Sequence, residues 1–330
     1  MKYEFGTLQK GEKNLITDVP GVRVGHCTIA NGDIQTGVTA VLPHDGDLFH
    51  EKCPAACHVI NGFGKSAGLM QIEELGAIET PIILTNTLSV GEAFTACVRY
   101  MLERNPGIGL TEGTVNPVIL ECNDGLLSDI RGLHIKEEHV RAAIAAADTS
   151  FELGAVGAGR GMSCYWMKGG IGSASRVFEI CGERYTLGAL VMTNFGSLKD
   201  LMICGDPVGK RLTGGGEVTK GSCIMLMATD APLSSRQLRR AANRAQSGLA
   251  RTGGITSGGS GEIAVIFSTA NRMKTSEDVW RPVILNEDRL EPVFRAVTET
   301  VEEAIIRSML EAETVTGRDG NTRRSLSEVL

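Results

Sequence analysis

Residues 220–232 read KGSCIMLMATDAP, in which Ser222 stands between a glycine-rich approach and an apolar run. The run from Cys223 to Ala228 is wholly apolar and is shorter than a typical buried helix. Pro232 has no amide hydrogen and disfavours helical angles at the residue before it, so the run predicts a buried central strand. The approach, residues 213–221, contains four glycines, which predicts a mobile segment on the protein surface.

A second stretch, residues 257–269, reads SGGSGEIAVIFST and again joins a glycine-rich turn to an apolar strand. Ser260 and Glu262 are two residues apart, and in an extended chain this spacing puts both side chains on one face. If the two strands are neighbours whose starts are level, Ser222 converges with this pair. The three residues would then supply a nucleophile, a second hydroxyl and a carboxylate, although Ser222 also fits an ordinary strand start.

A serine nucleophile needs a base, and histidine is the usual one. None of the histidines is close to Ser222 or Ser260 in the sequence, which makes a Ser-His-Asp triad less attractive without excluding a pair formed by folding. The α-amine of an N-terminal residue, with a reference pKa of about 7.7 to 8.0, is an alternative base. The six histidines are at positions 26, 44, 50, 58, 134 and 139.

The composition is that of a globular protein with a large core, with 330 residues, 42% hydrophobic and 22% charged, and a net charge of -6. The chain has no excess of basic residues of the kind that would indicate nucleic-acid binding, and no apolar run is long enough for a membrane helix. The nine cysteines have no framework spacing, which predicts buried free thiols in a reducing compartment. Since the N-terminus also lacks an apolar targeting region, we expect a cytoplasmic protein.

Three stretches imitate ligand sites but fail on spacing. Residues 58–66 lack the first glycine of a phosphate-binding loop, so a tight turn opening a helix over 65–75 is expected instead. Residues 154–161 lack the glycine order of a dinucleotide site. Cys53 and Cys57 have no second pair of metal ligands at a suitable spacing. We therefore expect no metal and no cofactor.

The remaining pattern mixes strands and helices without strict alternation, which favours a two-layer sheet core flanked by helices over a doubly wound sheet. The strand over 185–193 would present Asn194 at its end. No shift in composition divides the chain, so one domain over 1–330 is expected. The other predictions are strands over 36–42, 81–85 and 117–121, helices over 91–103, 136–147 and 286–313, a helix from Ser234 to Leu249, and a polar tail after Gly317.

Several motifs in one order make the chain similar to the self-processing L-aminopeptidase/D-esterase (DmpA) family, which includes β-aminopeptidases and nylon-oligomer hydrolases. The resemblance covers nearly the whole chain and implies an α+β fold, a four-layer αββα sandwich of the Ntn-hydrolase type. Besides the two serine-bearing stretches, the matching motifs are ITDVPGVRVGH at 16–26, NGFGKSAG at 61–68, LTNTLSVG at 84–91, KGGIG at 168–172 and TNFG at 193–196.

The resemblance also implies a mechanism. The precursor would cut itself between Gly221 and Ser222 into chains 1–221 and 222–330, and the freed Ser222 would be both N-terminus and nucleophile. Ser260 and Glu262 would complete the relay, and Asn194 would donate its amide to the oxyanion. The implied substrates are short peptides, amino-acid amides or esters, and the implied assembly is a homo-oligomer, a tetramer of cleaved α/β heterodimers.

The roles of two positions in the implied site, Asn123 and Lys168, are undecided from the sequence. Several relatives have an aromatic residue where this chain has Asn123, whose shorter amide is an alternative oxyanion donor, so the choice among D-amino acid, β-amino acid and L-peptide substrates stays open. Lys168 either assists the oxyanion or substrate, or is an exposed loop lysine. The alternative functions are a nylon-oligomer-type amidase, although those members use threonine in place of Ser222, an acyltransferase similar to ornithine acetyltransferase, and a non-catalytic binding protein.

Overall fold

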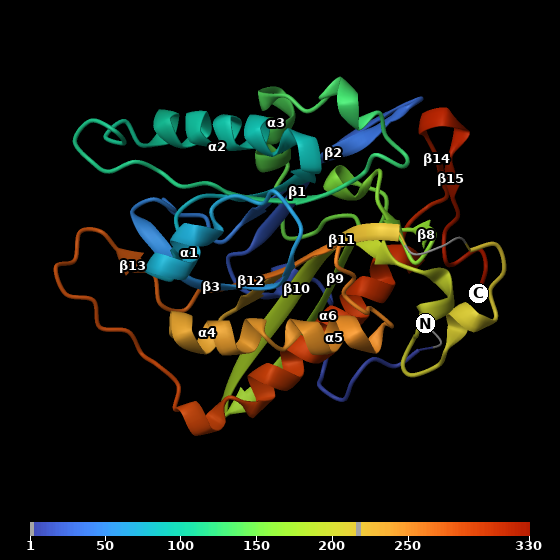
Figure 1. Ribbon diagram of the computed structural model, residues 1–330. Helices are drawn as coiled ribbons and strands as arrows, with labels where there is room; N and C mark the ends of the chain where they lie inside the picture. The colour runs from blue at the N-terminus through green and yellow to red at the C-terminus, as the bar shows by residue number, and fades with distance from the viewer. Residues whose placement is uncertain (1–2, 216–218) are drawn as a thin grey trace.

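The computed structural model describes residues 3–215 and 219–330, and these form four layers in the order helices, sheet, sheet, helices (Figure 1). The residues predicted to form a mobile approach are therefore only partly described, because 216–218 lie outside these ranges. None of the described helices combines the length and the apolar character needed to span a membrane.

The first sheet has the strand order β1-β2-β5-β6, with β1 and β2 antiparallel and β5 and β6 parallel. Helices α2 and α3 cover its outer face, where Ala93 and Val140 join one buried apolar cluster. The bounds are β1 Arg23–Asn31, β2 Ile34–Leu42, β5 Ile82–Asn86, β6 Val118–Cys122, α2 Val90–Arg104 and α3 Glu137–Ala145.

The second sheet has the order β13-β3-β12-β11-β10-β9, with β4 paired to β3. β11 and β12 run parallel, whereas β10 is antiparallel to β11 and β3 is antiparallel to β12. The bounds are β3 Glu51–Gly62, β4 Ala77–Ile78, β9 Gly170–Ile180, β10 Glu183–Gly196, β11 Thr219–Thr229, β12 Gly261–Ser268 and β13 Met273–Lys274.

The central strand β11 is buried on both faces, as the sequence predicts. Cys223, Met225 and Met227 pack in the core below the sheet, whereas Ile224 and Leu226 pack between the two sheets. Burying an apolar side chain of this size contributes about 1.5–3 kcal/mol. The strand therefore consists of apolar residues without the polar alternation of a half-exposed strand.

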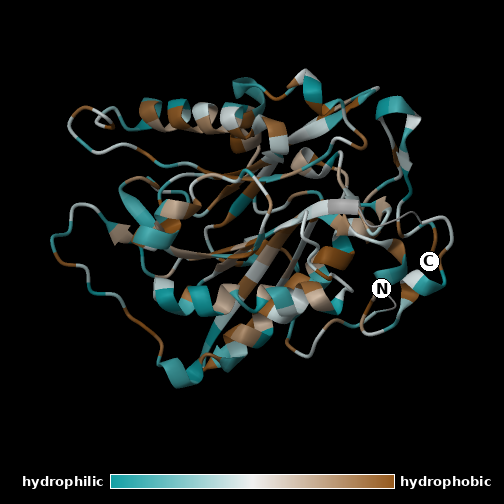
Figure 2. Cartoon of the chain, in the orientation of Figure 1, coloured by the Kyte–Doolittle hydropathy of each residue, from teal (hydrophilic) through white to brown (hydrophobic). Residues whose placement is uncertain are grey.

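The lower helices are α4 (Ser235–Ala242), α5 (Ala245–Arg251) and α6 (Glu291–Leu310). Ser234 caps α4 as predicted, because its hydroxyl accepts the Gln237 amide and the Gln237 side chain accepts the Ser234 amide. The helix expected from Ser234 to Leu249 is interrupted between α4 and α5. Figure 2 shows hydrophilic residues along the outer side of α4, opposite the core.

Two further sequence predictions about elements are wrong, and one strand was missed. The helix expected over 65–75 is shorter, α1 (Leu69–Leu75), because Gly68 has a φ of 87° that cannot continue a helix. The strand β9 was not expected. The residues after Gly317 are not a free polar tail, because β15 (Thr322–Arg323) pairs with β14 (Val315–Thr316) in a hairpin.

A second short hairpin joins β7 (Ser163–Cys164) to β8 (Met167–Lys168) beside the end of β10. Short 3-10 helices cover Ile16–Asp18, Thr87–Ser89, Ile130–Gly132, Gly157–Gly159, Leu198–Asp200, Val208–Lys210, Glu287–Arg289 and Arg318–Gly320.

Candidate active site

The starts of the two serine-bearing strands are level, which is the condition for Ser222 to approach the Ser260–Glu262 pair. On the parallel strands β11 and β12, Ser222 is paired with Gly261, and Cys223 with Glu262. A Cβ atom added to Gly261 would lie 3.4 Å from the Ser222 Oγ, so the serine hydroxyl lies over this glycine. Ser222 is 7% exposed.

Ser260 and Glu262 form a buried pair. The Ser260 hydroxyl donates a hydrogen bond to Oε1 of Glu262, and both residues are at most 2% exposed. The second oxygen, Oε2 of Glu262, is buried and has no hydrogen-bond partner among the described residues. Burial raises the pKa of Glu262, and the bond from Ser260 opposes this rise. The site thus contains a carboxylate with one acceptor still free.

The predicted convergence of these side chains is only partly realised in the intact chain. Since side chains alternate along a strand, Glu262 shares a face with Cys223, and Ser222 lies on the opposite face. Cys223 packs towards the lower helices, whereas the Ser222 face is directed between the sheets. Among the described residues, no hydrogen bond joins the Ser222 hydroxyl to Ser260 or Glu262.

Asn194 lies directly opposite Ser222 on the antiparallel strand β10. Its Oδ1 accepts a hydrogen bond from the Ser163 amide at 2.9 Å, and its Nδ2 donates to the Asn123 carbonyl oxygen at 2.8 Å. These two bonds fix the plane and the orientation of the amide. The second Nδ2 hydrogen has no partner among the described residues, so it remains available to a ligand beside Ser222.

Asn123 contributes its main chain to this arrangement. Its carbonyl holds Asn194, whereas its own side chain is exposed and accepts a hydrogen bond from the Gly125 amide at 2.9 Å. The structure thus brings Asn123 to the site, but its side-chain oxygen is engaged in a local turn. Only its Nδ2 hydrogens are left as donors.

Lys168 is not an exposed loop lysine, so that expectation is wrong. It is fully buried, and its Nζ donates to the carbonyl oxygens of Gly159, Met162 and Gly169 at 2.7–2.9 Å. Three carbonyl oxygens thus surround the Nζ, so its donors are engaged within the protein. Burial holds the pKa of Lys168 well below its usual value. The lysine ties together the loop that precedes β9.

Comparison with known proteins decides the family. Residues 14–323 match the sequence profile of peptidase family S58. The chain belongs to peptidase family S58. This S58 chain is 39% identical to the β-peptidyl aminopeptidase BapA of Sphingosinicella microcystinivorans, over 96% of its own length and 86% of the relative's. It is therefore a hydrolase of the aminopeptidase type, as expected.

Solved structures agree with this assignment. The PH0078 protein from Pyrococcus horikoshii OT3 is 53% identical, with a TM-score of 0.96 over 98% of this chain and 94% of that one. The L-aminopeptidase D-Ala-esterase/amidase from Ochrobactrum anthropi is 36% identical, with a TM-score of 0.92 over 97% and 93%. That enzyme is described as a prototype of the serine aminopeptidases and a variant of the Ntn-hydrolase fold. The predicted αββα sandwich is thus confirmed.

Sequence reasoning missed two buried acids of the S58 chain near Asn123. Glu121, near the C-terminal end of β6, accepts hydrogen bonds from the Lys65 amide and the Thr87 hydroxyl. Asp124 is 1% exposed, and burial raises its pKa to about 7, an effect that the neighbouring Thr36 and Asn86 side chains oppose. The signal for both was an acidic residue at the end of an apolar strand.

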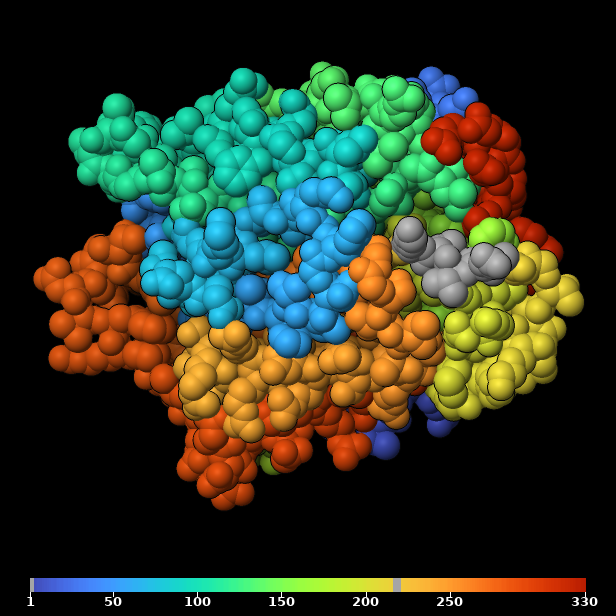
Figure 3. All heavy atoms as spheres, viewed as in Figure 1, coloured from blue at the N-terminus to red at the C-terminus, as the bar shows by residue number. Residues whose placement is uncertain are grey.

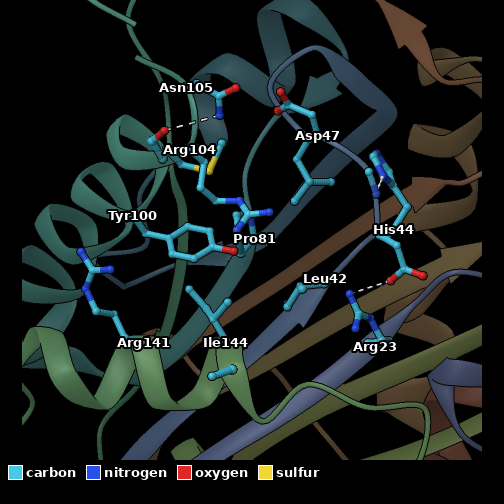
Figure 4. A pocket seen from close by; sticks show the side chains of 15 residues that line it. Arg23, Leu42, His44, Asp47, Pro81, Tyr100, Arg104, Asn105, Arg141 and Ile144 are labelled. Carbon is cyan, nitrogen blue, oxygen red and sulfur yellow. Dashed lines mark hydrogen bonds and ion pairs between the residues drawn. The ribbon is translucent and has the colours of Figure 1, made fainter. Parts of the chain in front are cut away.

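A small cavity adjoins the buried pair. It has a volume of about 20 Å³, which is room for about one water molecule, and it lies beside Ser260, Glu262, Phe195 and Ile255. A larger hollow of about 430 Å³ lies elsewhere, between the first sheet and its helices, and is shown in Figure 4. Its lining residues all fall within 23–145 and include none of the candidate catalytic residues, so its size does not mark the active site.

Proposed function

We propose that this S58 aminopeptidase cuts its own chain between Gly221 and Ser222 and then hydrolyses substrates with the freed N-terminal serine. The observation that carries the proposal is the position of Ser222, which is opposite Asn194 on one neighbouring strand and level with the Ser260–Glu262 pair on the other. None of the six histidines is hydrogen-bonded to Ser222 in the described part of the chain. A base within the nucleophile's own residue fits this arrangement.

The first reaction would be an acyl shift. The Ser222 Oγ attacks the Gly221 carbonyl carbon, the peptide bond to the Ser222 nitrogen breaks, and an ester to the Ser222 oxygen forms while the nitrogen takes up a proton. Water then hydrolyses the ester and leaves a Gly221 carboxylate. Gly221 packs so closely that an added Cβ would lie 1.8 Å from the Asn194 carbonyl oxygen, which supports a role for glycine at this position.

Cleavage would also remove the separation between Ser222 and Glu262. As an N-terminal residue, Ser222 is no longer bound to Gly221, so its α-amine is free to approach the neighbouring strand. The buried Oε2 of Glu262 lacks a partner, and an ammonium group would satisfy it. The amine would take the proton of the serine hydroxyl during attack on a substrate carbonyl, and Glu262 and Ser260 would orient it.

Asn194 would stabilise the oxyanion of both reactions through its second Nδ2 hydrogen. Removal of one such donor in another serine hydrolase costs about 2.7–4 kcal/mol of transition-state stabilisation. The bonds from Ser163 and to Asn123 fix the donor before the substrate arrives, so no orientation is lost during reaction. The exposed amide of Asn123 would be a second, weaker donor.

The proposed substrates are short peptides, amino-acid amides or esters with a free amino terminus, which agrees with the β-peptidyl and D-Ala-esterase/amidase activities in the names of the relatives. We also propose that no metal or cofactor takes part. For the assembly we propose a cytoplasmic homo-oligomer. Support for oligomerisation comes from the exposed apolar side chains of Val279, Trp280, Val283 and Ile284 in one loop.

Intact mass spectrometry tests the proposal directly. The wild-type chain should separate into fragments 1–221 and 222–330, whereas Ser222→Ala should stay intact and lack amidase activity. Ser276→Ala, which changes an exposed loop serine, is the matched control and should behave as wild type. A Ser222→Ala chain that is still cut after residue 221 and still hydrolyses amides would rule out the mechanism, and so would activity lost to a chelator and restored by zinc.

A further inference from the structure

Arg323, at the end of the C-terminal hairpin β14–β15, is a buried cation without an acidic partner. It is 6% exposed, and no carboxylate of the described residues pairs with it. Its Nε donates to the Ser163 Oγ at 2.8 Å, and one terminal nitrogen donates to the Thr322 carbonyl oxygen at 3.0 Å. Burial of an unpaired guanidinium is costly, so the protein retains this residue against a stability penalty.

The partner of Arg323 touches the proposed oxyanion donor. The Ser163 hydroxyl accepts from Arg323, and the Ser163 amide donates to the Asn194 Oδ1 at 2.9 Å. The three residues belong to β15, β7 and β10, and all three are buried. A continuous hydrogen-bonded path thus connects the C-terminal hairpin to the amide opposite Ser222.

The β7–β8 hairpin needs such support because its turn is strained. Tyr165 and Trp166 both have positive φ, 49° and 66°, in a two-residue turn where glycine and asparagine are preferred. Bulky residues in this region are held only by their surroundings and cost about 1–3 kcal/mol each. Tyr165 is anchored by its hydroxyl contact to Thr252 at 2.9 Å and by an edge contact with Phe195.

Arg323 supports the other residue of the turn. Its guanidinium lies 4.1 Å from the centre of the Trp166 ring, a cation–π distance. The next residue of the C-terminal segment also contributes, because the Arg324 carbonyl oxygen accepts the Lys168 amide at 2.8 Å. Figure 3 shows the C-terminal segment, in red, lying directly against green residues of the middle of the chain.

We propose that Arg323 is a positioning residue for the S58 reaction, which holds Ser163 and Trp166 so that the Asn194 amide is fixed beside Ser222. This inference rests on the proposed role of Asn194. It assigns a function to the C-terminal hairpin, namely to hold the oxyanion donor in place. Arg323 itself does not touch the substrate or the reacting atoms.

Steady-state kinetics on the fully cleaved enzyme would test the role, with an amino-acid p-nitroanilide that the wild type hydrolyses. Arg323→Met should lower kcat at least tenfold and leave KM within twofold, because the substrate contacts remain while the oxyanion donor is free to turn. Arg323→Lys should recover part of the loss, since an ammonium can still reach Ser163 and Trp166. Arg184→Met, which alters an exposed arginine at the opposite end of β10 from Asn194, should match wild type.

A double-mutant cycle separates positioning from general destabilisation. Ser163→Ala removes the hydroxyl that accepts from Arg323 and keeps the amide that binds Asn194, so it should reproduce part of the loss in kcat. The fold-loss in kcat of the double variant, Ser163→Ala with Arg323→Met, should be smaller than the product of the two single losses, because either change alone already breaks the path. A purely structural role would lower the melting temperature and leave kcat of the folded enzyme unchanged.

The inference is overturned if Arg323→Met keeps kcat within twofold of wild type, or if the two changes multiply independently. If Arg323→Met does not fold, Ser163→Ala alone tests the inference. A wild-type kcat in Ser163→Ala would then refute the hydrogen-bonded path from Arg323 to Asn194. These results would leave the proposed function standing. An active, cleaved Ser222→Ala chain would instead refute the proposed function itself.

Discussion

Asp124 is expected to make the stability of the chain depend on pH, and Asp124→Asn should remove this dependence. Burial raises the pKa of the carboxyl from an ordinary 3.8 to about 7. The folded chain therefore holds this proton more tightly than the unfolded chain does. Below about pH 4 both states are protonated and the group has no effect, whereas between pH 4 and 7 the unfolded state gains by ionising. The free energy of unfolding thus falls as the pH rises through this range.

The size of the effect follows from the shift. About three pH units at 1.36 kcal/mol each give a loss of about 4 kcal/mol above pH 7, and about two fifths of that is already present at pH 5. Asparagine has the same shape and no charge, but its amide would also lie buried and would cost about 1–3 kcal/mol where it finds no acceptor. The free energy of unfolding of Asp124→Asn, relative to that of the wild type, should therefore rise by about 3 kcal/mol from pH 5 to pH 8.

Urea unfolding at pH 5, 6, 7 and 8 would measure this difference. The comparison is best made in a Ser222→Ala background, in which both chains stay uncut and unfold as one polypeptide. Asp278→Asn, at an exposed position, is the control and should give a constant difference across the range. Parallel pH profiles for Asp124→Asn and its parent would show that Asp124 is ionised in the folded protein and would refute the reasoning.

Three further changes address the catalytic proposal. Asn194→Ala should lower kcat by about 10²–10³ and slow self-cleavage, which kinetics and timed intact-mass measurements would detect; unchanged values would exclude it as the oxyanion donor. Glu262→Gln should keep the circular dichroism spectrum and impair turnover, because a neutral amide no longer orients the Ser222 ammonium; full activity would remove Glu262 from the mechanism. Gly221→Ala should block cleavage, since its Cβ would lie 1.8 Å from the Asn194 carbonyl oxygen, and normal cleavage on a mass spectrum would contradict this.

The sequence predicted the parts of the fold that depend on local pattern. The apolar run after Ser222 and the spacing of Ser260 and Glu262 were enough to predict two buried strands and a paired hydroxyl and carboxylate. The face on which Ser222 lies was not predictable in the same way. A shift of one residue in the register between β11 and β12 would turn every side chain of a strand to the other face, and the sequence does not specify that register.

Other features depended on contacts that no local pattern contains. β9 was missed because its residues are small where helix α6 packs against it: a Cβ added to Gly172 would lie 1.9 Å from the Ala304 carbonyl oxygen of α6. Arg323 looked like part of a solvated tail, and only the folded chain places it against Ser163. Lys168 stood in a glycine-rich stretch typical of a loop, and its burial follows from three carbonyl oxygens supplied by the surrounding chain.

The strand order β3-β12-β11-β10 bears on how the two-chain enzyme would be assembled. The proposed cleavage falls within β11, so β3, β10 and the start of β11 up to Gly221 would belong to one polypeptide, and β12 and the rest of β11 to the other. The shorter polypeptide would thus be intercalated between two strands of the longer one. The products could separate only by breaking ladders on both sides of the inserted pair. Folding must then precede cutting, and the halves synthesised separately would each present unpaired strand edges before they met. The association of the two polypeptides would therefore depend on the order of folding and cleavage as much as on the equilibrium stability of the cut enzyme.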